Sequence, residues 1–181
     1  MGGSYCSGSF GSISYIWKNI LGDKIMVEGE LAYLALDRKS GAIAMLLRRR
    51  DNNLLLPIWI GNPEAYSIAM ALAGIKPPRP MTHDLIVDIL SAINAKLSRV
   101  VITGLKNETF YALLHIDRGE TETYVIDARP SDSIALAVRT GCPIFLSEDM
   151  QYFDLDNPKT PLEQELSQIL SRLSPDELIG F

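Results

Sequence analysis

The sequence predicts an α+β fold with a mixed or antiparallel sheet, in which a unit of three strands and one helix occurs twice. Short apolar runs separated by turn residues recur along the chain, and each group of three ends in an alanine-rich helical segment. The segments at 61–74 and 127–141 share one layout: apolar strand, proline, acidic residue, Ser-Ile-Ala helix and glycine stop. They close two predicted repeats, at about 31–74 and 99–141, which favours a duplication.

The first repeat is expected to hold three strands and a buried helix. The strands are predicted at 31–36, 42–47 and 54–60. Their apolar residues are continuous rather than alternating, which is typical of strands covered on both faces, and Pro57 indicates an edge strand or a bulge. Trp59 is expected in the core. The helix has Asn62 as its cap and Pro63 at its first position, and it ends at Gly74.

The second repeat follows a proline-rich connector at 77–80 and another helix. Thr82 can cap this helix, and Asp84 lies in its first turn, where the helix dipole favours an anion. Apolar residues at helical spacing predict that one face packs on the sheet: Leu85, Ile86, Ile89, Leu90, Ile93 and Leu97. Strands are then predicted at 99–105, 109–116 and 123–127, a helix at 131–139 and a last strand at 143–146.

Three regions are expected along the chain. Residues 1–25 form a Gly/Ser-rich N-terminal extension outside the repeats, residues 26–150 form the domain, and residues 151–181 form an acidic helical tail. The tail shows two capping-box patterns, which start at Thr160 and Ser174. From Ser147 onward eight acidic residues face two basic ones, so the net charge of −5 belongs to the tail and does not argue against a polyanionic partner.

The composition indicates a cytoplasmic location. The two cysteines, Cys6 and Cys142, lie in unrelated contexts without metal-type spacing, which fits a reducing compartment. No apolar stretch approaches the roughly 20 residues of a membrane span, and the N-terminus lacks a basic signal-peptide region, so no membrane partner is expected. There is no glycine-rich phosphate loop, HExxH or aromatic-studded basic strand, which disfavours sequence-specific binding of nucleic acid.

Several blocks of sequence, in order and in register from about residue 27 to 149, resemble the bifunctional nuclease domain family. They are Pro-Ile-Trp-Ile-Gly at 57–61, Arg-Pro-Met-Thr-His-Asp-Leu at 79–85, Thr-Phe-Tyr-Ala at 109–112 and Asp-Ala-Arg-Pro-Ser-Asp-Ser-Ile-Ala-Leu-Ala at 127–137. The resemblance implies hydrolysis of both DNA and RNA. It does not supply a catalytic residue set, so the candidates below come from the chemistry of the side chains.

Phosphodiester hydrolysis needs an activated water and positive charge near the phosphate. The expected catalytic residues are Asp127, Asp132, His83 and Asp84, and the expected divalent metal, Mg²⁺ or Mn²⁺, would be held by Asp127, Asp132 and Glu64. The expected substrate-binding residues are Arg79, Arg129, Arg48 and Arg49. The predicted function is a metal-assisted nuclease that acts on DNA or RNA without strong sequence specificity.

Structural roles are open for the same residues. Glu64, Asp84 and Asp132 all fall in first helical turns, where acids stabilise a helix without any catalytic role. Asp127 and Arg129 can pair with each other in a structural salt bridge, and His115 is expected to be a packed histidine. The alternative function is therefore a non-enzymatic oligomeric module with a ligand or partner cleft between the repeats. Both functions are compatible with a homo-oligomer, because strands that are apolar on both faces need cover.

Overall fold

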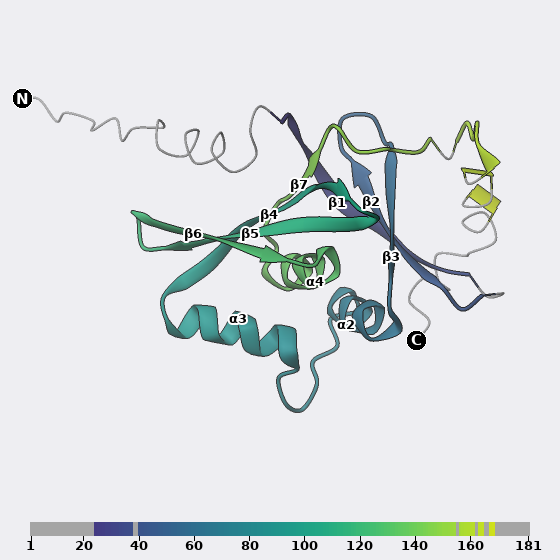
Figure 1. The fold of residues 1–181 in the computed structure, drawn as a ribbon. Helices are drawn as coiled ribbons and strands as arrows, with labels where there is room; N and C mark the ends of the chain where they lie inside the picture. Colours follow the sequence, from purple (N-terminus) through teal and green to yellow (C-terminus); the bar gives the residue numbers. More distant parts are fainter. Residues whose placement is uncertain (1–23, 38–39, 155, 162, 165–166, 169–181) are drawn as a thin grey trace, which may run out of the picture.

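One seven-stranded sheet carries helices on one face (Figure 1). The computed structural model describes residues 24–37, 40–154, 156–161, 163–164 and 167–168. The strands are β1 (Met26–Leu36), β2 (Ile43–Arg49), β3 (Leu55–Ile60), β4 (Ala95–Lys106), β5 (Thr109–Arg118), β6 (Glu122–Ala128) and β7 (Ile144–Ser147). The helices are α2 (Asn62–Leu72), α3 (Thr82–Ala92) and α4 (Pro130–Thr140).

The strand order is β3-β2-β1-β7-β4-β5-β6, which confirms the predicted α+β class with a mixed sheet. The short strand β7 lies at the centre, antiparallel to β1 and parallel to β4, and the other pairs are antiparallel. A three-strand unit followed by a helix thus lies on each side of β7. This order alone does not establish a common origin for the two units, and the duplication stays a prediction. The edge position of β3 explains how Pro57 fits, since an edge strand can lack one amide donor.

The core lies between the sheet and helices α2 and α4. Small residues on both helices, such as Ala65 and Ala135, are fully buried and allow the two helices to approach each other. The predicted burial of α2 holds for only one side, because Tyr66 and Leu72 are half exposed. Trp59, which was expected in the core, is also half exposed, and that expectation is wrong.

Helix α3 differs most from its prediction. It ends at Ala92, because Asn94 adopts a left-handed backbone (φ 54°) that turns the chain directly into β4. Leu97, predicted on the helix, is therefore a buried residue of β4. Ile86 and Leu90 pack against the core as expected, and Val87 packs there without having been predicted to, but Leu85, Ile89 and Ile93 are about half exposed.

The ends of the helices follow the predicted chemistry with small shifts. Gly61 and Met81 are the N-caps, one residue before the predicted Asn62 and Thr82. The Thr160 capping box is confirmed: the Glu163 carboxylate accepts the Thr160 amide at 2.6 Å, and the Thr160 hydroxyl accepts the Glu163 amide at 3.2 Å. The Ser174 pattern and nearly all of the 1–25 extension lie outside the described residues. Within the described ranges, no helix is both long and apolar enough to cross a membrane.

Candidate functional site

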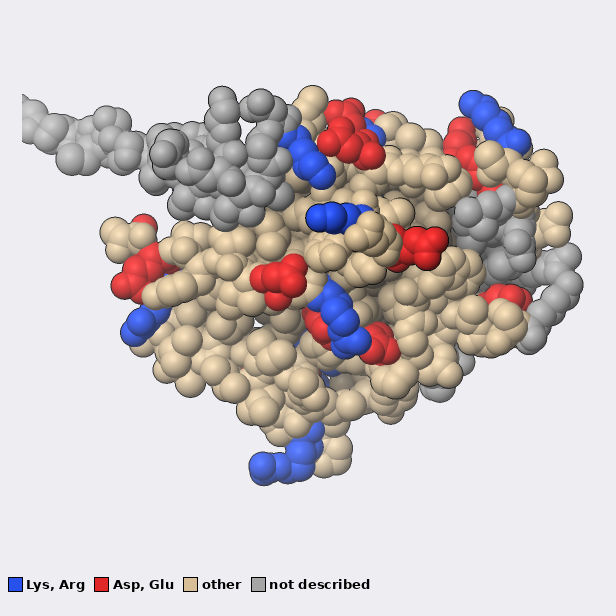
Figure 2. Space-filling model, in the orientation of Figure 1, with Lys and Arg blue, Asp and Glu red and all other residues tan. Residues whose placement is uncertain are grey.

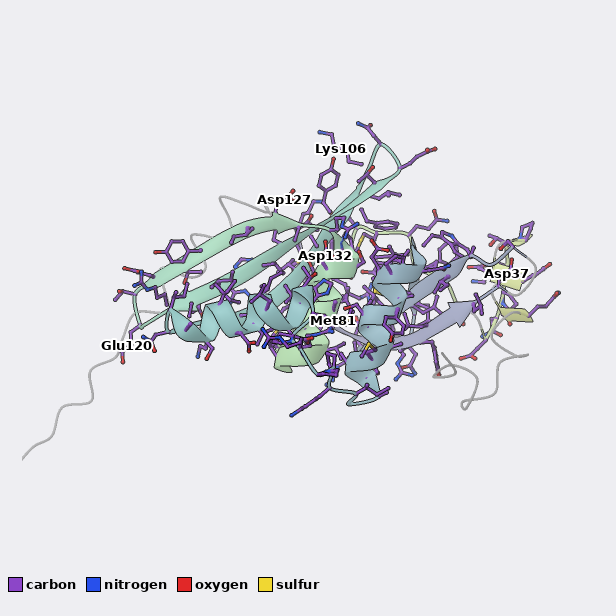
Figure 3. All side chains as sticks on the ribbon, turned by 90° about the horizontal axis from the view of Figure 1, so that it is seen from below. Asp37, Met81, Lys106, Glu120, Asp127 and Asp132 are labelled. Atoms are coloured by element: carbon purple, nitrogen blue, oxygen red, sulfur yellow. The ribbon has the colours of Figure 1, made fainter. Side chains whose placement is uncertain are left out.

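The first turns of α2, α3 and α4 meet at one cavity of about 920 Å³ beneath β5 and β6. Figure 3 labels Met81 and Asp132 near the middle of the view, and Asp127 on the edge strand β6. One end of the cavity is polar and is lined by Glu64, Ser67, His83, Asp127, Arg129 and Asp132. The other end is apolar and includes Ile86, Leu90, Leu114, Ile116 and Ile126. The polar end lies where three positive helix-dipole ends converge.

Arg129 joins two of these helix starts. Its guanidinium grips Asp132 with two prongs, Nε to Oδ2 at 2.7 Å and Nη2 to Oδ1 at 2.9 Å. Its remaining nitrogen, Nη1, donates to Glu64 Oε1 at 2.9 Å. The Arg129 side chain is nevertheless 64% exposed, so it remains accessible from the solvent. These charge-assisted bonds raise the pKa of Arg129, the contact with Asp132 contributing most.

His83 links Asp132 to Ser67. Its Nε2 lies 3.2 Å from Asp132 Oδ1, and its Nδ1 lies 2.9 Å from the Ser67 hydroxyl. Arg139 Nη2 also donates to Ser67 Oγ at 3.2 Å, and a guanidinium can only donate. The Ser67 hydrogen is thus free to be donated to Nδ1. These contacts fit a His83 ring that accepts at Nδ1 from Ser67 and donates from Nε2–H to Asp132.

Asp84 does not join the Asp132–His83–Ser67 chain of hydrogen bonds, because it is bound by Arg139 instead. Arg139 Nε donates to Asp84 Oδ1 at 2.6 Å, while Asp84 Oδ2 accepts the Met81 amide at 2.9 Å. The bond from Arg139 lowers the pKa of Asp84. For Asp132, burial acts to raise the pKa, but hydrogen bonds from Arg129 and His83 outweigh it and lower the pKa overall. Both carboxylates are therefore ionised at neutral pH.

Asp127 lines the same cavity but does not join the cluster. Ile126 and Ala128 face the helices, because Ile126 pairs with the core residue Leu114, so Asp127 between them starts from the opposite face of β6. The Asp127 side chain is exposed. In the described part of the chain, no hydrogen bond or ion pair joins it to Arg129 or Asp132. The predicted Asp127–Arg129 salt bridge is thus absent, and Arg129 pairs with Glu64 and Asp132 instead.

The other predicted arginines lie away from the cavity. Arg79 is exposed in the proline-rich connector and does not line the cavity. Arg48 pairs with Glu30 across β1 and β2, and Arg49 pairs with Asp51 at 2.6 Å. The structure therefore brings together Glu64, His83, Arg129 and Asp132, with Asp84 adjacent, and leaves Arg48, Arg49 and Arg79 outside.

The predicted metal ligands have the right chemistry but not a ready arrangement. Glu64, Asp127 and Asp132 are oxygen donors of the kind that Mg²⁺ and Mn²⁺ prefer, and all three line one cavity. Across the residues that the structure describes, however, no three His, Cys, Asp or Glu side chains are grouped to hold an ion. Glu64 and Asp132 are already bound by Arg129. These residues do not fit a metal as they are arranged here, and the metal stays a prediction.

Ser67 and Arg139 were not predicted as site residues. Each had a signal in the sequence, since Ser67 lies three residues after Glu64 and Arg139 lies seven after Asp132, spacings that place each pair on one helical face. The sequence did not show that these faces of α2 and α4 contact each other, as they do through Arg139 and Ser67.

The fold and site define a small α+β domain with a linked carboxylate, imidazole and guanidinium cluster at an open cavity. The bifunctional nuclease domain matches residues 45–152, and the chain belongs to that family. This confirms the resemblance seen in the sequence.

Two kinds of relative are similar to this chain. An uncharacterized protein of Mycobacterium tuberculosis (strain H37Rv) is 42% identical over 123 residues, which cover 68% of this chain and 73% of that protein. Bifunctional nuclease 1 of Oryza sativa subsp. japonica is 29% identical over 112 residues, and Bifunctional nuclease 2 of Arabidopsis thaliana is 26% identical over 114. The match covers 34% of the rice protein and 35% of the Arabidopsis protein.

Proposed function

We propose that this chain is a nuclease of low sequence specificity that hydrolyses phosphodiester bonds of DNA and RNA. The main support is that this chain belongs to the bifunctional nuclease domain family. Its cavity also brings four residues together at the polar end: Glu64, His83, Arg129 and Asp132. The names of the plant relatives, which match this chain over 112 and 114 residues, support the reaction type.

Each residue of the cluster has a role in the proposal. Arg129 uses three of its five guanidinium N–H groups on Asp132 and Glu64, and a remaining N–H donates to a phosphate oxygen. Asp132 orients the His83 imidazole and stabilises its positive charge after it accepts a proton. Ser67 and His83 both line the cavity and are hydrogen-bonded to each other, so a water there passes its proton to Ser67 Oγ as Ser67 passes its own to Nδ1. The resulting hydroxide attacks phosphorus, and the leaving oxygen takes a proton from solvent.

Charge is the reason to keep a divalent cation in the proposal. Three carboxylates, Glu64, Asp127 and Asp132, line the cavity with a single arginine, Arg129. A phosphate that approaches this end therefore meets net negative charge. Bound Mg²⁺ or Mn²⁺ would supply the missing positive charge, and it would need Arg129 to release at least one carboxylate.

The test is hydrolysis of single-stranded DNA and RNA by the purified protein, in EDTA and with added Mg²⁺ or Mn²⁺. We expect activity that EDTA abolishes and that Asp132→Asn and His83→Gln each lower by about 100-fold or more. Asp88→Asn is the matched control, because Asp88 is an exposed carboxylate of α3 that does not line the cavity. Activity that survives both variants, with their folds verified by circular dichroism, contradicts this site.

A second function is favoured by the apolar end of the cavity. In this alternative, the chain is a non-enzymatic module that binds a ligand with an apolar body, and the polar cluster only joins the helices. Every acid in the three first turns has a hydrogen-bond partner, which is what a structural role requires. Absence of hydrolysis with any metal, together with binding of an apolar fluorescent probe in the cavity, supports this function over the nuclease.

A further inference from the structure

Helix α3 exposes an apolar ridge that the fold does not explain. Leu85, Ile89 and Ile93 follow one another at intervals of four residues, so they form a straight row on the helix surface. Their exposures are 51%, 51% and 49%, and α3 has no fully buried residue. We call this row the α3 ridge. Figure 2 shows the surface over α3 largely without Lys, Arg, Asp or Glu atoms.

The α3 ridge lies beside the apolar end of the cavity. On a helix of 3.6 residues per turn, Ile86 and Leu90 follow directly on from the ridge, and both line the cavity together with Ile126 of β6. Ile126 is half exposed, and so is Tyr124, two residues earlier on the same face of β6. A raised apolar row and an apolar hollow are thus neighbours on one continuous surface.

The area of this surface is that of the apolar part of a protein interface. Six large side chains contribute to it: Met81, Leu85, Ile89, Ile93, Tyr124 and Ile126, each 38–51% exposed. If side chains of this size carry roughly 150 to 200 Å² each, the patch exposes on the order of 500 Å². Monomeric proteins rarely expose more than a few hundred Å² of contiguous apolar surface, and a stable interface buries about 800 Å² per partner, a little over half of it non-polar.

We propose that this surface binds a second copy of this chain about a two-fold axis, with the α3 ridge of each copy in the apolar hollow of the other. An isologous interface requires a surface that is complementary to itself, and a ridge beside a hollow of the same apolar chemistry meets that requirement. Little charge opposes this contact. Of the two acids of α3, Asp84 is neutralised by Arg139, and only Asp88, beside the ridge, brings an unpaired charge near the interface.

The second copy would complete the cavity without closing it. The ridge covers the apolar end, near Ile86, Leu90 and Ile126, and shields it from water. The polar end, with Glu64, Arg129 and Asp132, stays open for a ligand. The partner copy therefore supplies one wall of the site in either proposed function.

Sedimentation of the full chain across a dilution series tests the proposal. We expect a wild-type dimer and a Leu85→Asp/Ile89→Asp variant whose dissociation constant rises about 30-fold or more. Both positions are half exposed in the single chain, so we expect circular dichroism and thermal midpoint to stay close to wild type. Leu105→Asp is the matched control, because Leu105 is a 56% exposed leucine on β4 outside the patch and its variant is expected to remain a dimer.

Disulfide crosslinking between introduced cysteines distinguishes this dimer interface from any other. In a background with Cys6 and Cys142 replaced by serine, copies with Ile89→Cys and copies with Ile126→Cys should form a disulfide-linked heterodimer when mixed and oxidised. A wild-type monomer at every concentration, a dimer that survives the ridge variant, or a dimer without the mixed crosslink overturns the proposal.

Discussion

Arg139 and Asp84 join the last turn of α4 to the first turn of α3 through a 2.6 Å bond from Nε to Oδ1. The same guanidinium donates to the carbonyl of Ala135 at 2.9 Å and to the hydroxyl of Ser67 on α2 at 3.2 Å. One side chain, only 10% exposed, therefore fixes the relative positions of the three helices whose first turns form the cavity.

Asp84→Asn should destabilise the protein by about 2 kcal/mol at pH 7, because it leaves the mostly buried Arg139 charge without its counter-ion. Urea unfolding at pH 7 measures the change. Asp88→Asn on the same helix is the control, since Asp88 is exposed, and it should stay within about 0.5 kcal/mol of wild type. Equal stabilities for the two variants would show that Arg139 does not need Asp84.

Lowering the pH should remove the stabilisation that the Asp84–Arg139 ion pair provides. Arg139 holds the pKa of Asp84 below its ordinary value of 3.8, so the carboxylate stabilises the folded chain above that value. The stabilisation is lost as the pH falls below 3.8 towards the folded-state pKa. We therefore expect the stability gap between wild type and Asp84→Asn to narrow from pH 5 to pH 3. A gap that is constant over this range contradicts the assignment.

His115 should make the protein less stable in mildly acidic solution. Burial, followed by the charge of Arg99, lowers the pKa of His115 to about 4 from 6.5, and Arg99 Nη2 lies 3.2 Å from its Nδ1. Above pH 6.5 the imidazole is neutral in both the folded and the unfolded chain. Between pH 6.5 and 4 the unfolded chain binds a proton that the folded chain refuses, so stability falls by about 1.4 kcal/mol per pH unit, roughly 3 kcal/mol in all.

Unfolding by urea at pH 7, 6, 5 and 4.5 measures this slope. His115→Phe fills a similar volume and cannot titrate, so its stability should fall less steeply over the same range, whatever its value at pH 7. Parallel pH dependence in the wild type and the variant would mean that His115 is protonated in the folded chain.

Ser67→Ala should change the protonation of the His83 ring. If Ser67 donates to Nδ1 in the wild type, nitrogen NMR should show an unprotonated Nδ1 and a protonated Nε2 at pH 8. Without the hydroxyl, Nδ1 loses its hydrogen-bond partner, and we expect a mixture of tautomers and a loss of about 1 kcal/mol of stability. Ser91→Ala is the control, because Ser91 is an exposed serine of α3, the helix that carries His83. A protonated Nδ1 in the wild type contradicts this direction of the hydrogen bonds.

Local elements could be predicted because their signals are local. Turn residues and apolar runs locate the strands within a few residues, and Pro63, Asp84 and Asp132 mark first helical turns. The end of α3 could not be placed, because it depends on the left-handed backbone at Asn94, and apolar residues continue past it to Leu97.

The site could be predicted only in part, because its contacts join helices far apart in the sequence. Glu64 and Arg129 are 65 residues apart, and Arg139 and Ser67 are 72 apart. The separation of Arg48 from the site follows from strand register, which sets Arg48 directly opposite Glu30. A single sequence shows neither the helix packing nor the register, so it supplies residue types without their partners.

Arg129 and Arg48 give the sharpest test of what the structure adds to the sequence. Both were predicted to bind phosphate, but only Arg129 lines the cavity. Arg129→Gln should lower hydrolysis of single-stranded DNA and RNA by about 100-fold, since it removes a positive donor near the reacting phosphate and leaves Glu64 and Asp132 to repel the substrate. Arg129→Lys should recover part of the rate, because it keeps the charge without the two-pronged contact.

Initial rates for the Arg129 variants, Arg48→Gln and Arg118→Gln decide between the two positions. Arg118→Gln is the control, because Arg118 is an exposed residue at the end of β5, outside the cavity, and its loss should leave the rate unchanged. Because Arg48 is bound to Glu30 away from the cavity, we expect Arg48→Gln to resemble this control. A large loss in Arg48→Gln with none in Arg129→Gln would move the phosphate site to β2, which carries Arg48 and Arg49.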